Sequence, residues 1–179
     1  MITLKEVMEK AGGMDARTAY FKMLQLVIYR GNYLLLLSRK YNRRRNWIDR
    51  ALAIFANVFV AVWIFKSDWA QVSAIVIAAT HILTILKPLF GVVKNAVVIE
   101  QALIEFQAVR YQVEEDWWKI DFEDWTDKQI LDAMLRIKQK EFSVFSRIMY
   151  AGIDEDEKVA REAGERAAEY VKKAFPGCS

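Results

Sequence analysis

Residues 47–93, WIDRALAIFANVFVAVWIFKSDWAQVSAIVIAATHILTILKPLFGVV, decide the fold of this chain. They contain two apolar blocks, 51–65 and 72–86, joined by the short polar connector 66–68. With its flanking residues, each block approaches the roughly 20 residues that the hydrocarbon core of a bilayer requires. The stretch therefore predicts a transmembrane hairpin.

Three tryptophans lie at the ends of these blocks: Trp47, Trp63 and Trp69. At such positions an indole ring can sit in the headgroup layer and keep its N–H hydrated, so we expect all three to contact lipid. The alternative is a pair of buried helices inside a soluble bundle. Neither block has the regular polar face of a helix in contact with water, which favours the membrane.

The charges around the hairpin divide the chain into three regions. Residues 1–46 carry ten Lys and Arg against three acids, whereas residues 100–179 carry twelve against eighteen. We therefore expect basic cytosolic helices over 1–46, the hairpin over 47–93 and an acidic helical region over 94–179. The single Cys178 excludes an intrachain disulfide, and the charged first residues predict an unprocessed N-terminus.

The sequence as a whole predicts an all-α fold, because it holds only two prolines and seven glycines and little alternation of period two. Capping patterns place a short helix after Thr3, a long one from Ala16 to about Arg45, one from Thr126 to about Tyr150 and a last one after Asp154, which ends before Pro176. A further helix continues from the hairpin to about Val113. The predicted apolar faces contain Phe21, Leu24, Val27, Ile28, Leu35, Val93, Val97, Leu103, Phe106, Val109, Leu131, Met134, Ile137, Phe142, Phe145 and Met149.

A basic cluster precedes the first block and runs from Arg39 to Arg45, with Lys40, Arg43 and Arg44 between them and Arg50 a little beyond. Basic residues beside a span stay on the cytoplasmic side, so both termini are predicted to be cytoplasmic. Attraction to anionic lipid explains the cluster. Nucleic-acid binding is a weaker interpretation, because aromatic interleaving and a recognisable motif are lacking.

Polar residues within the spans form lines at helical spacing. On the second span these are Ser73, Thr80, Thr84 and Lys87, and on the first span Asn57 belongs to a comparable stripe. They either pack the two helices together or line a polar path. Because two helices cannot enclose a pore, a path requires a ring of copies. His81 is then a candidate pH-sensitive gate.

Acidic residues alternate with aromatic rings over 114–129, EEDWWKIDFEDWTDKQ. This stretch predicts a corner between helices. Its Trp117, Trp118 and Trp125 either pack that corner or dock another protein or an activating ligand. No catalytic constellation, metal site or cofactor motif emerges around the single histidine, so an enzyme is not expected.

The basic helix ending in Arg43-Arg44-Arg45-Asn46-Trp47, the close-set two-span hairpin and the helical tail resemble SLATT-type two-transmembrane effectors of bacterial antiphage systems. Members of that family accompany synthases of nucleotide second messengers and sometimes reverse transcriptases. The resemblance implies a homo-oligomer that permeabilises the inner membrane when infection is sensed, through a sensor protein or a nucleotide second messenger. A membrane-anchored scaffold and a soluble helical interaction domain are the alternatives.

Overall fold

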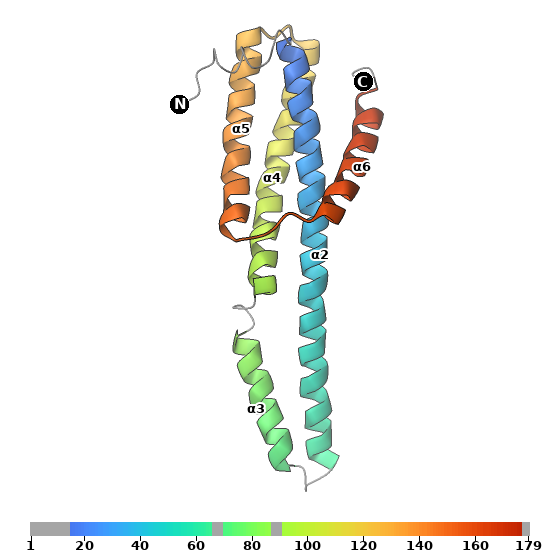
Figure 1. The fold of residues 1–179 in the computed structure, drawn as a ribbon, viewed down its shortest axis with the longest axis vertical. Coiled ribbons are helices and arrows are strands. Elements are labelled where there is room, and N and C mark those ends of the chain that lie inside the picture. Colours follow the sequence, from blue (N-terminus) through green and yellow to red (C-terminus); the bar gives the residue numbers. More distant parts are fainter. Residues whose placement is uncertain (1–14, 66–69, 87–90, 177–179) are drawn as a thin grey trace. The chain divides into compact units, whose positions relative to one another are not determined.

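The computed structural model describes residues 15–65, 70–86 and 91–176, and these residues form five helices and no strand. In chain order the helices are α2 (Ala16–Phe65), α3 (Ala70–Leu86), α4 (Gly91–Phe122), α5 (Asp127–Tyr150) and α6 (Glu157–Ala174) (Figure 1). The predicted all-α class is confirmed. The short helix predicted after Thr3 lies outside the described residues.

The chain divides into two compact units. The bundle unit contains Met1–Leu36 and Gln101–Ser179, and the hairpin unit contains Leu37–Glu100. Both α2 and α4 contribute residues to each unit.

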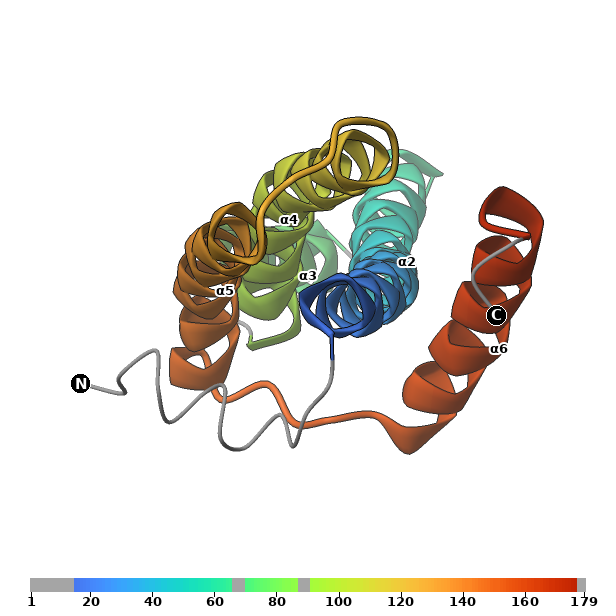
Figure 2. The same ribbon diagram turned by 90° about the horizontal axis from the view of Figure 1, so that it is seen from above.

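The bundle unit is built around apolar side chains from all four of its helices. Tyr20, Leu24 and Ile28 on α2 and Phe106 on α4 are fully buried in one cluster, which α5 completes with Ile137. Figure 2 shows α5 and α6 on opposite sides of α2 within this unit. The heptad-like spacing of the buried residues on each helix explains why these amphipathic segments fold together.

Polar contacts fix the register between α4 and α5. The Lys140 ammonium donates to Gln112 Oε1 at 2.5 Å, and Arg147 forms an ion pair with Glu105. These contacts place the two helices side by side in antiparallel orientation, because the earlier residue on α4 pairs with the later residue on α5. The hydrogen bond from Arg147 lowers the pKa of Glu105.

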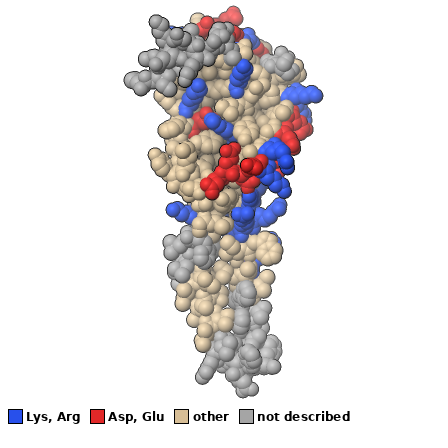
Figure 3. Space-filling model, viewed as in Figure 1, with Lys and Arg blue, Asp and Glu red and all other residues tan. Residues whose placement is uncertain are grey.

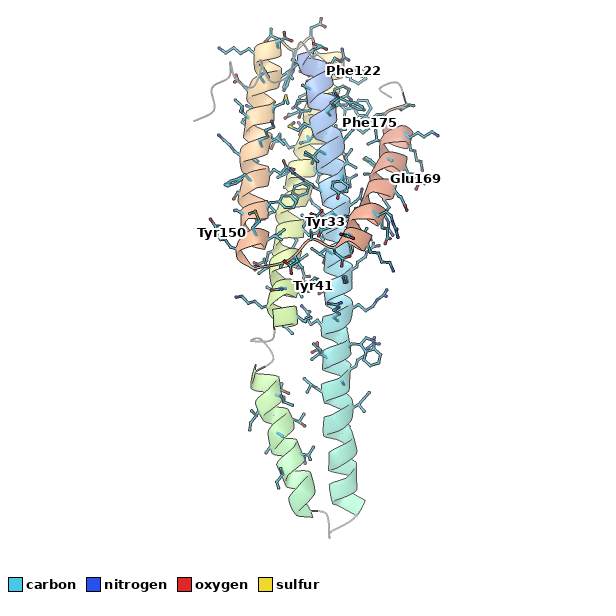
Figure 4. The ribbon with its side chains drawn as sticks, viewed as in Figure 1. Tyr33, Tyr41, Phe122, Tyr150, Glu169 and Phe175 are labelled. Carbon is cyan, nitrogen blue, oxygen red and sulfur yellow. The ribbon has the colours of Figure 1, made fainter. Side chains whose placement is uncertain are left out.

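Helix α6 packs on the bundle mainly through small side chains. Val159, Ala163, Ala167 and Val171 are its buried residues. Its first turn is held where the Asp156 amide donates to the Tyr33 hydroxyl at 3.1 Å, and Phe175 packs beside the far end of the helix (Figure 4). The inner face of α6 is therefore poor in apolar area.

Four apolar side chains are buried in the described part of the hairpin unit. Leu37 on α2 and Val93, Ala96 and Ile99 on α4 are buried there. Its charged contacts lie nearby, where Arg45 approaches Glu100 at 3.9 Å. No helix of the described residues is both long enough and apolar enough to cross a membrane.

Several boundaries differ from those predicted. Helix α2 does not end near Arg45 but continues to Phe65, because no Gly or Pro lies between Arg45 and Phe65. Likewise α4 continues past Val113 to Phe122, so only residues 123–126 form the corner. The capping box of Thr126 and Gln129 is confirmed.

Other corrections concern caps and side chains. The last helix is capped by Asp156, whose side chain accepts from the Val159 amide, and not by Asp154. Phe142 and Met149 were predicted on the apolar face of α5, yet they are 74% and 76% exposed. Val97 on α4 is also exposed. These helices carry apolar residues on two faces, and only one face packs.

Candidate functional site

The hairpin unit exposes apolar side chains on α3. Ile75, Ile82 and Leu83 are 69%, 57% and 42% exposed, and Ala78 and Ala79 are exposed between them. Because α3 contains no charged residue, its described part is uniformly tan in Figure 3. Single exposed leucines and isoleucines are common on soluble proteins, but several exposed apolar side chains together, as over the described part of α3, are typical of a surface that contacts lipid or protein.

The polar residues predicted to line a path lie on this same helix. Thr80 is half-buried and Thr84 is exposed. Each hydroxyl donates to the carbonyl one turn earlier, Thr80 to Val76 and Thr84 to Thr80, both at 2.8 Å. Such bonds satisfy a hydroxyl within its own helix, so these threonines tolerate an apolar environment. The side chain of Ser73 and the whole of Lys87 lie outside the described residues.

Two further path candidates are exposed. His81 on α3 and Asn57 on α2 both have accessible side chains. His81 follows Thr80 directly, so it lies about 100° around the helix from it. It therefore does not share the line of Thr80 and Thr84.

The basic cluster of α2 contains an exposed face with graded chemistry. Arg39, Arg43, Trp47, Arg50 and Ile54 follow spacings of four and three residues, so they share one side of the helix. All five are exposed, with Trp47 at 69% and Ile54 at 62%. The face begins with two guanidinium groups, continues with an indole and a third guanidinium group, and ends with an aliphatic side chain, a combination found at membrane interfaces. Reading the sequence at this helical spacing would have added Ile54 to the predicted lipid contacts.

The other predicted lipid contacts are placed less uniformly. Arg44 is exposed, while Arg45 is half-buried beside Glu100. The side chain of Trp63 and the whole of Trp69 lie outside the described residues.

The three tryptophans predicted to dock a partner occupy different environments in the bundle unit. Trp117 is 3% exposed and packs against Phe21 with ring centroids 5.0 Å apart, so it belongs to the core and cannot dock a partner. Trp125 is half-buried, and its indole N–H donates to Glu123 at 3.3 Å. Only Trp118 is exposed, at 46%.

Trp118 forms one side of an exposed aromatic pair. Its ring stacks on Phe122 with centroids 5.9 Å apart and an interplanar angle of 15°. Phe122 is 78% exposed and lies at the same end of the bundle unit as Phe175 (Figure 4). This pair is the part of the acidic and aromatic stretch that remains available for recognition.

A buried polar pair lies beside Trp117. The Tyr20 hydroxyl lies 3.4 Å from the Asp116 carboxylate, and Asp116 is 6% exposed. Burial raises the pKa of Asp116, while Arg136 and Lys119 oppose the shift. Burial also raises the pKa of Tyr20, and the Asp116 charge adds to this effect. Both shifts follow from the cost of charge in a poorly solvated place.

A second polar cluster joins α4 to α6. Arg110 donates to Glu114 at 2.8 Å and lies over the Tyr170 ring at 4.5 Å, while the Tyr170 hydroxyl donates to Glu114 at 3.2 Å. Burial alone would lower the pKa of Arg110, but Glu114 and Tyr170 more than offset it and the pKa is raised. The cluster therefore attaches α6 to α4 through a charged and aromatic network.

Ligand chemistry is sparse in the part of the chain that the structure describes. There, no three residues among His, Cys, Asp and Glu lie close enough to hold a metal ion. A surface depression on α6 is lined only by charged residues of that one helix: Lys158, Arg161, Glu162 and Glu165.

Comparison with known proteins adds no relative. The sequence matches no protein-family model, and neither a characterised protein nor a solved structure matches the chain.

Proposed function

We propose that the protein is a membrane effector, with the hairpin unit inserted in a bilayer as a two-helix hairpin. The exposed apolar surface of α3 carries this proposal, since Ile75, Ile82 and Leu83 would be lipid-facing in a bilayer. An unsatisfied polar group is costly in lipid, and the Thr80 and Thr84 hydroxyls avoid this cost because each donates to a main-chain carbonyl within α3.

The length of the hairpin helices sets a condition on this insertion. Helix α3 has 17 residues, and at 1.5 Å per residue it is about 26 Å long, a few Å short of a typical hydrocarbon core. A bilayer accommodates a short span by thinning locally, at a cost of fractions of a kcal/mol per Å. The insertion is therefore short but physically reasonable.

The graded face of α2 supports one orientation. Arg43 and Arg50 bracket Trp47 over about 10 Å of helix, similar to the depth of a headgroup layer. Guanidinium groups at this level attract anionic lipid and remain on the cytoplasmic side. We accordingly propose the bacterial inner membrane as the location, with both termini in the cytoplasm.

The proposed activity is permeabilisation or depolarisation of that membrane by an oligomer. Thr80 and Thr84 share one line on α3, and their hydroxyls can exchange the main-chain carbonyl for a water molecule or an ion. Asn57 and His81 supply further exposed polar groups. The resemblance to SLATT-type effectors supports infection as the trigger, signalled by a sensor protein or a nucleotide second messenger.

Two measurements on the full chain test this function. Carbonate extraction of membranes reports insertion, and dye release from liposomes reports permeabilisation. We expect Thr80→Leu with Thr84→Leu to abolish release while leaving the protein in the membrane fraction. Ile82→Leu, on the same helix but on its apolar face, is the matched control and should leave release unchanged. Equal release from both variants would remove the polar line from the mechanism.

A second candidate function is a membrane-anchored scaffold that forms no pore. The exposed pair of Trp118 and Phe122 favours it, because stacked exposed rings are common at recognition sites. Firm membrane association without any dye release would select this function. Recovery of the wild-type chain in the carbonate supernatant would instead select a soluble helical interaction domain.

A further inference from the structure

The bundle unit carries two exposed apolar stripes on neighbouring helices. On α4, Ile104, Tyr111 and Trp118 are 66%, 71% and 46% exposed. The stripe on α5 consists of Leu135, Phe142 and Met149, which are 39%, 74% and 76% exposed. We call these the α4 stripe and the α5 stripe.

Both stripes have a spacing of seven residues. Seven residues fall about 20° short of two turns of an α-helix, so such a row drifts slowly around the helix. A second helix can follow the row only by coiling around it with a left-handed crossing, as in coiled coils. The spacing thus points to a helical occupant for each stripe, and each stripe has the geometry to occupy the other.

The stripes also lie at matching heights along the bundle unit. Gln112 is level with Lys140, and Glu105 is level with Arg147, because these pairs are in direct contact. Counting from those contacts places three pairs within one residue, about 1.5 Å, of the same height. The pairs are Ile104 with Met149, Tyr111 with Phe142, and Trp118 with Leu135.

The two stripes point away from the core in different directions. On α4, the stripe lies on the side opposite Phe106 and Val113, and on α5 it lies opposite Ile137 and Val144, as the helical spacing requires. A chain therefore cannot pair its own two stripes. A neighbouring copy rotated about an axis parallel to these helices would present its α5 stripe to the α4 stripe at the correct height.

We propose that copies of this chain assemble head to tail, with the α4 stripe of one copy packed on the α5 stripe of the next. A contact between two different surfaces of the same chain closes into a ring when the rotation allows it. Copies related in this way keep the same end up, as copies inserted in one membrane must. In this respect the inference rests on the proposed function and supplies the interface of its oligomer.

The exposed area is large enough for such a contact. At roughly 200 Å² for a large side chain, the exposed parts of the two stripes and Phe122 amount to about 900 Å². Flanking polar side chains would raise the total above the roughly 1,000 Å² of a specific interface. A second copy is favoured over an unrelated partner because both halves of the interface occur on one chain, in register.

Cysteine cross-linking of the full chain in membranes tests the interface. In a Cys178→Ser background, we expect Tyr111→Cys combined with Phe142→Cys to give a ladder of covalent oligomers beyond the dimer. Ile104→Cys combined with Leu135→Cys is the matched control, because these positions are out of register by about 21 Å along the helix. That pair should give only background cross-linking.

Single-cysteine variants decide the type of contact. Tyr111→Cys alone and Phe142→Cys alone should not form dimers, whereas a mixture of the two should. Dimers of either single variant would overturn the head-to-tail arrangement in favour of a twofold one. Absence of cross-links from the in-register pair would overturn the interface altogether. Cross-linking does not depend on dye release. A chain that forms no pore could therefore still show this interface.

Discussion

The two units of the chain differ in how they combine buried apolar, exposed apolar and charged side chains. In the bundle unit, Phe106 and Ile137 are fully buried and the charges lie outside in pairs such as Arg147 with Glu105. In the hairpin unit, Ile75 and Ile82 are exposed, and α3 has no charge at all. Since helices orient their side chains to suit the surroundings, the proposed insertion of the hairpin unit in a bilayer would account for this difference.

The largest effect is expected in the bundle core. Replacing Phe106 by Ala removes a ring that is fully buried and packs edge-on against Phe145 at 5.5 Å. We expect a loss of about 3–5 kcal/mol in the free energy of unfolding. Chemical denaturation in mild detergent measures it. Ile104→Ala, two residues away and 66% exposed, is the control and should change stability by less than about 0.5 kcal/mol.

A charge on α3 tests the other side of the comparison. In water, Ile82→Lys would be harmless because Ile82 is 57% exposed. In a bilayer, the same lysine near the middle of a span would cost about 3 kcal/mol. We expect the variant to shift from the membrane pellet to the carbonate supernatant. Unchanged extraction would mean that Ile82 does not face lipid, and the contrast between the units would disappear.

A smaller effect is expected from a partly buried ion pair in the bundle unit. Glu141 is 6% exposed and its carboxylate lies 2.7 Å from Arg30, which also lies over the Phe145 ring. Replacement of Glu141 by Gln leaves Arg30 without its counter-charge, but Arg30 is partly solvated. A loss of about 1–3 kcal/mol in thermal stability is therefore expected. Glu169→Gln, on the exposed side of α6 (Figure 4), should have no measurable effect.

The smallest effect is a dependence on pH at Asp116. Because burial raises its pKa, the folded chain holds this proton more tightly than the unfolded chain. The stabilisation is present at a pH below the ordinary carboxyl value of about 4 and is lost as the pH rises through the raised value. Asp116→Asn should therefore be slightly more stable than wild type at neutral pH. Melting curves at several pH values should show this gain shrinking toward pH 4, and a constant difference would contradict the assignment.

Local patterns predicted most of the helical structure. The capping box of Thr126 and Gln129 and the end of the last helix before Pro176 depend on neighbouring residues only, and both are confirmed. The predicted helix ends near Arg45 and Val113 are wrong, because the composition changes at these points but α2 and α4 continue to Phe65 and Phe122. Composition can change along a helix without ending it.

The candidate site was less predictable. Trp117 and Trp118 are neighbours in the sequence, yet one is buried and the other is exposed, because 100° of rotation separates them on α4. Phe142 and Met149 fit an apolar face by spacing, but α5 carries two such rows and the core takes only one. Which row packs depends on the partner helices, and that information is not local. The seven-residue spacing of the α4 and α5 stripes is the sequence pattern that distinguishes these outer rows.

The alanine-rich inner face of α6 has a consequence for amide exchange. Ala163 and Ala167 bury a single methyl group each, so most of the attachment comes from Val159, Val171 and the Phe175 ring. Separating this helix from the bundle should therefore require less energy than opening α4 or α5. Deuterium should enter the main chain of 157–174 first, well before global unfolding. Separation of α6 would expose more of Trp118 and Phe175, while α2, α4 and α5 stay protected within the bundle unit.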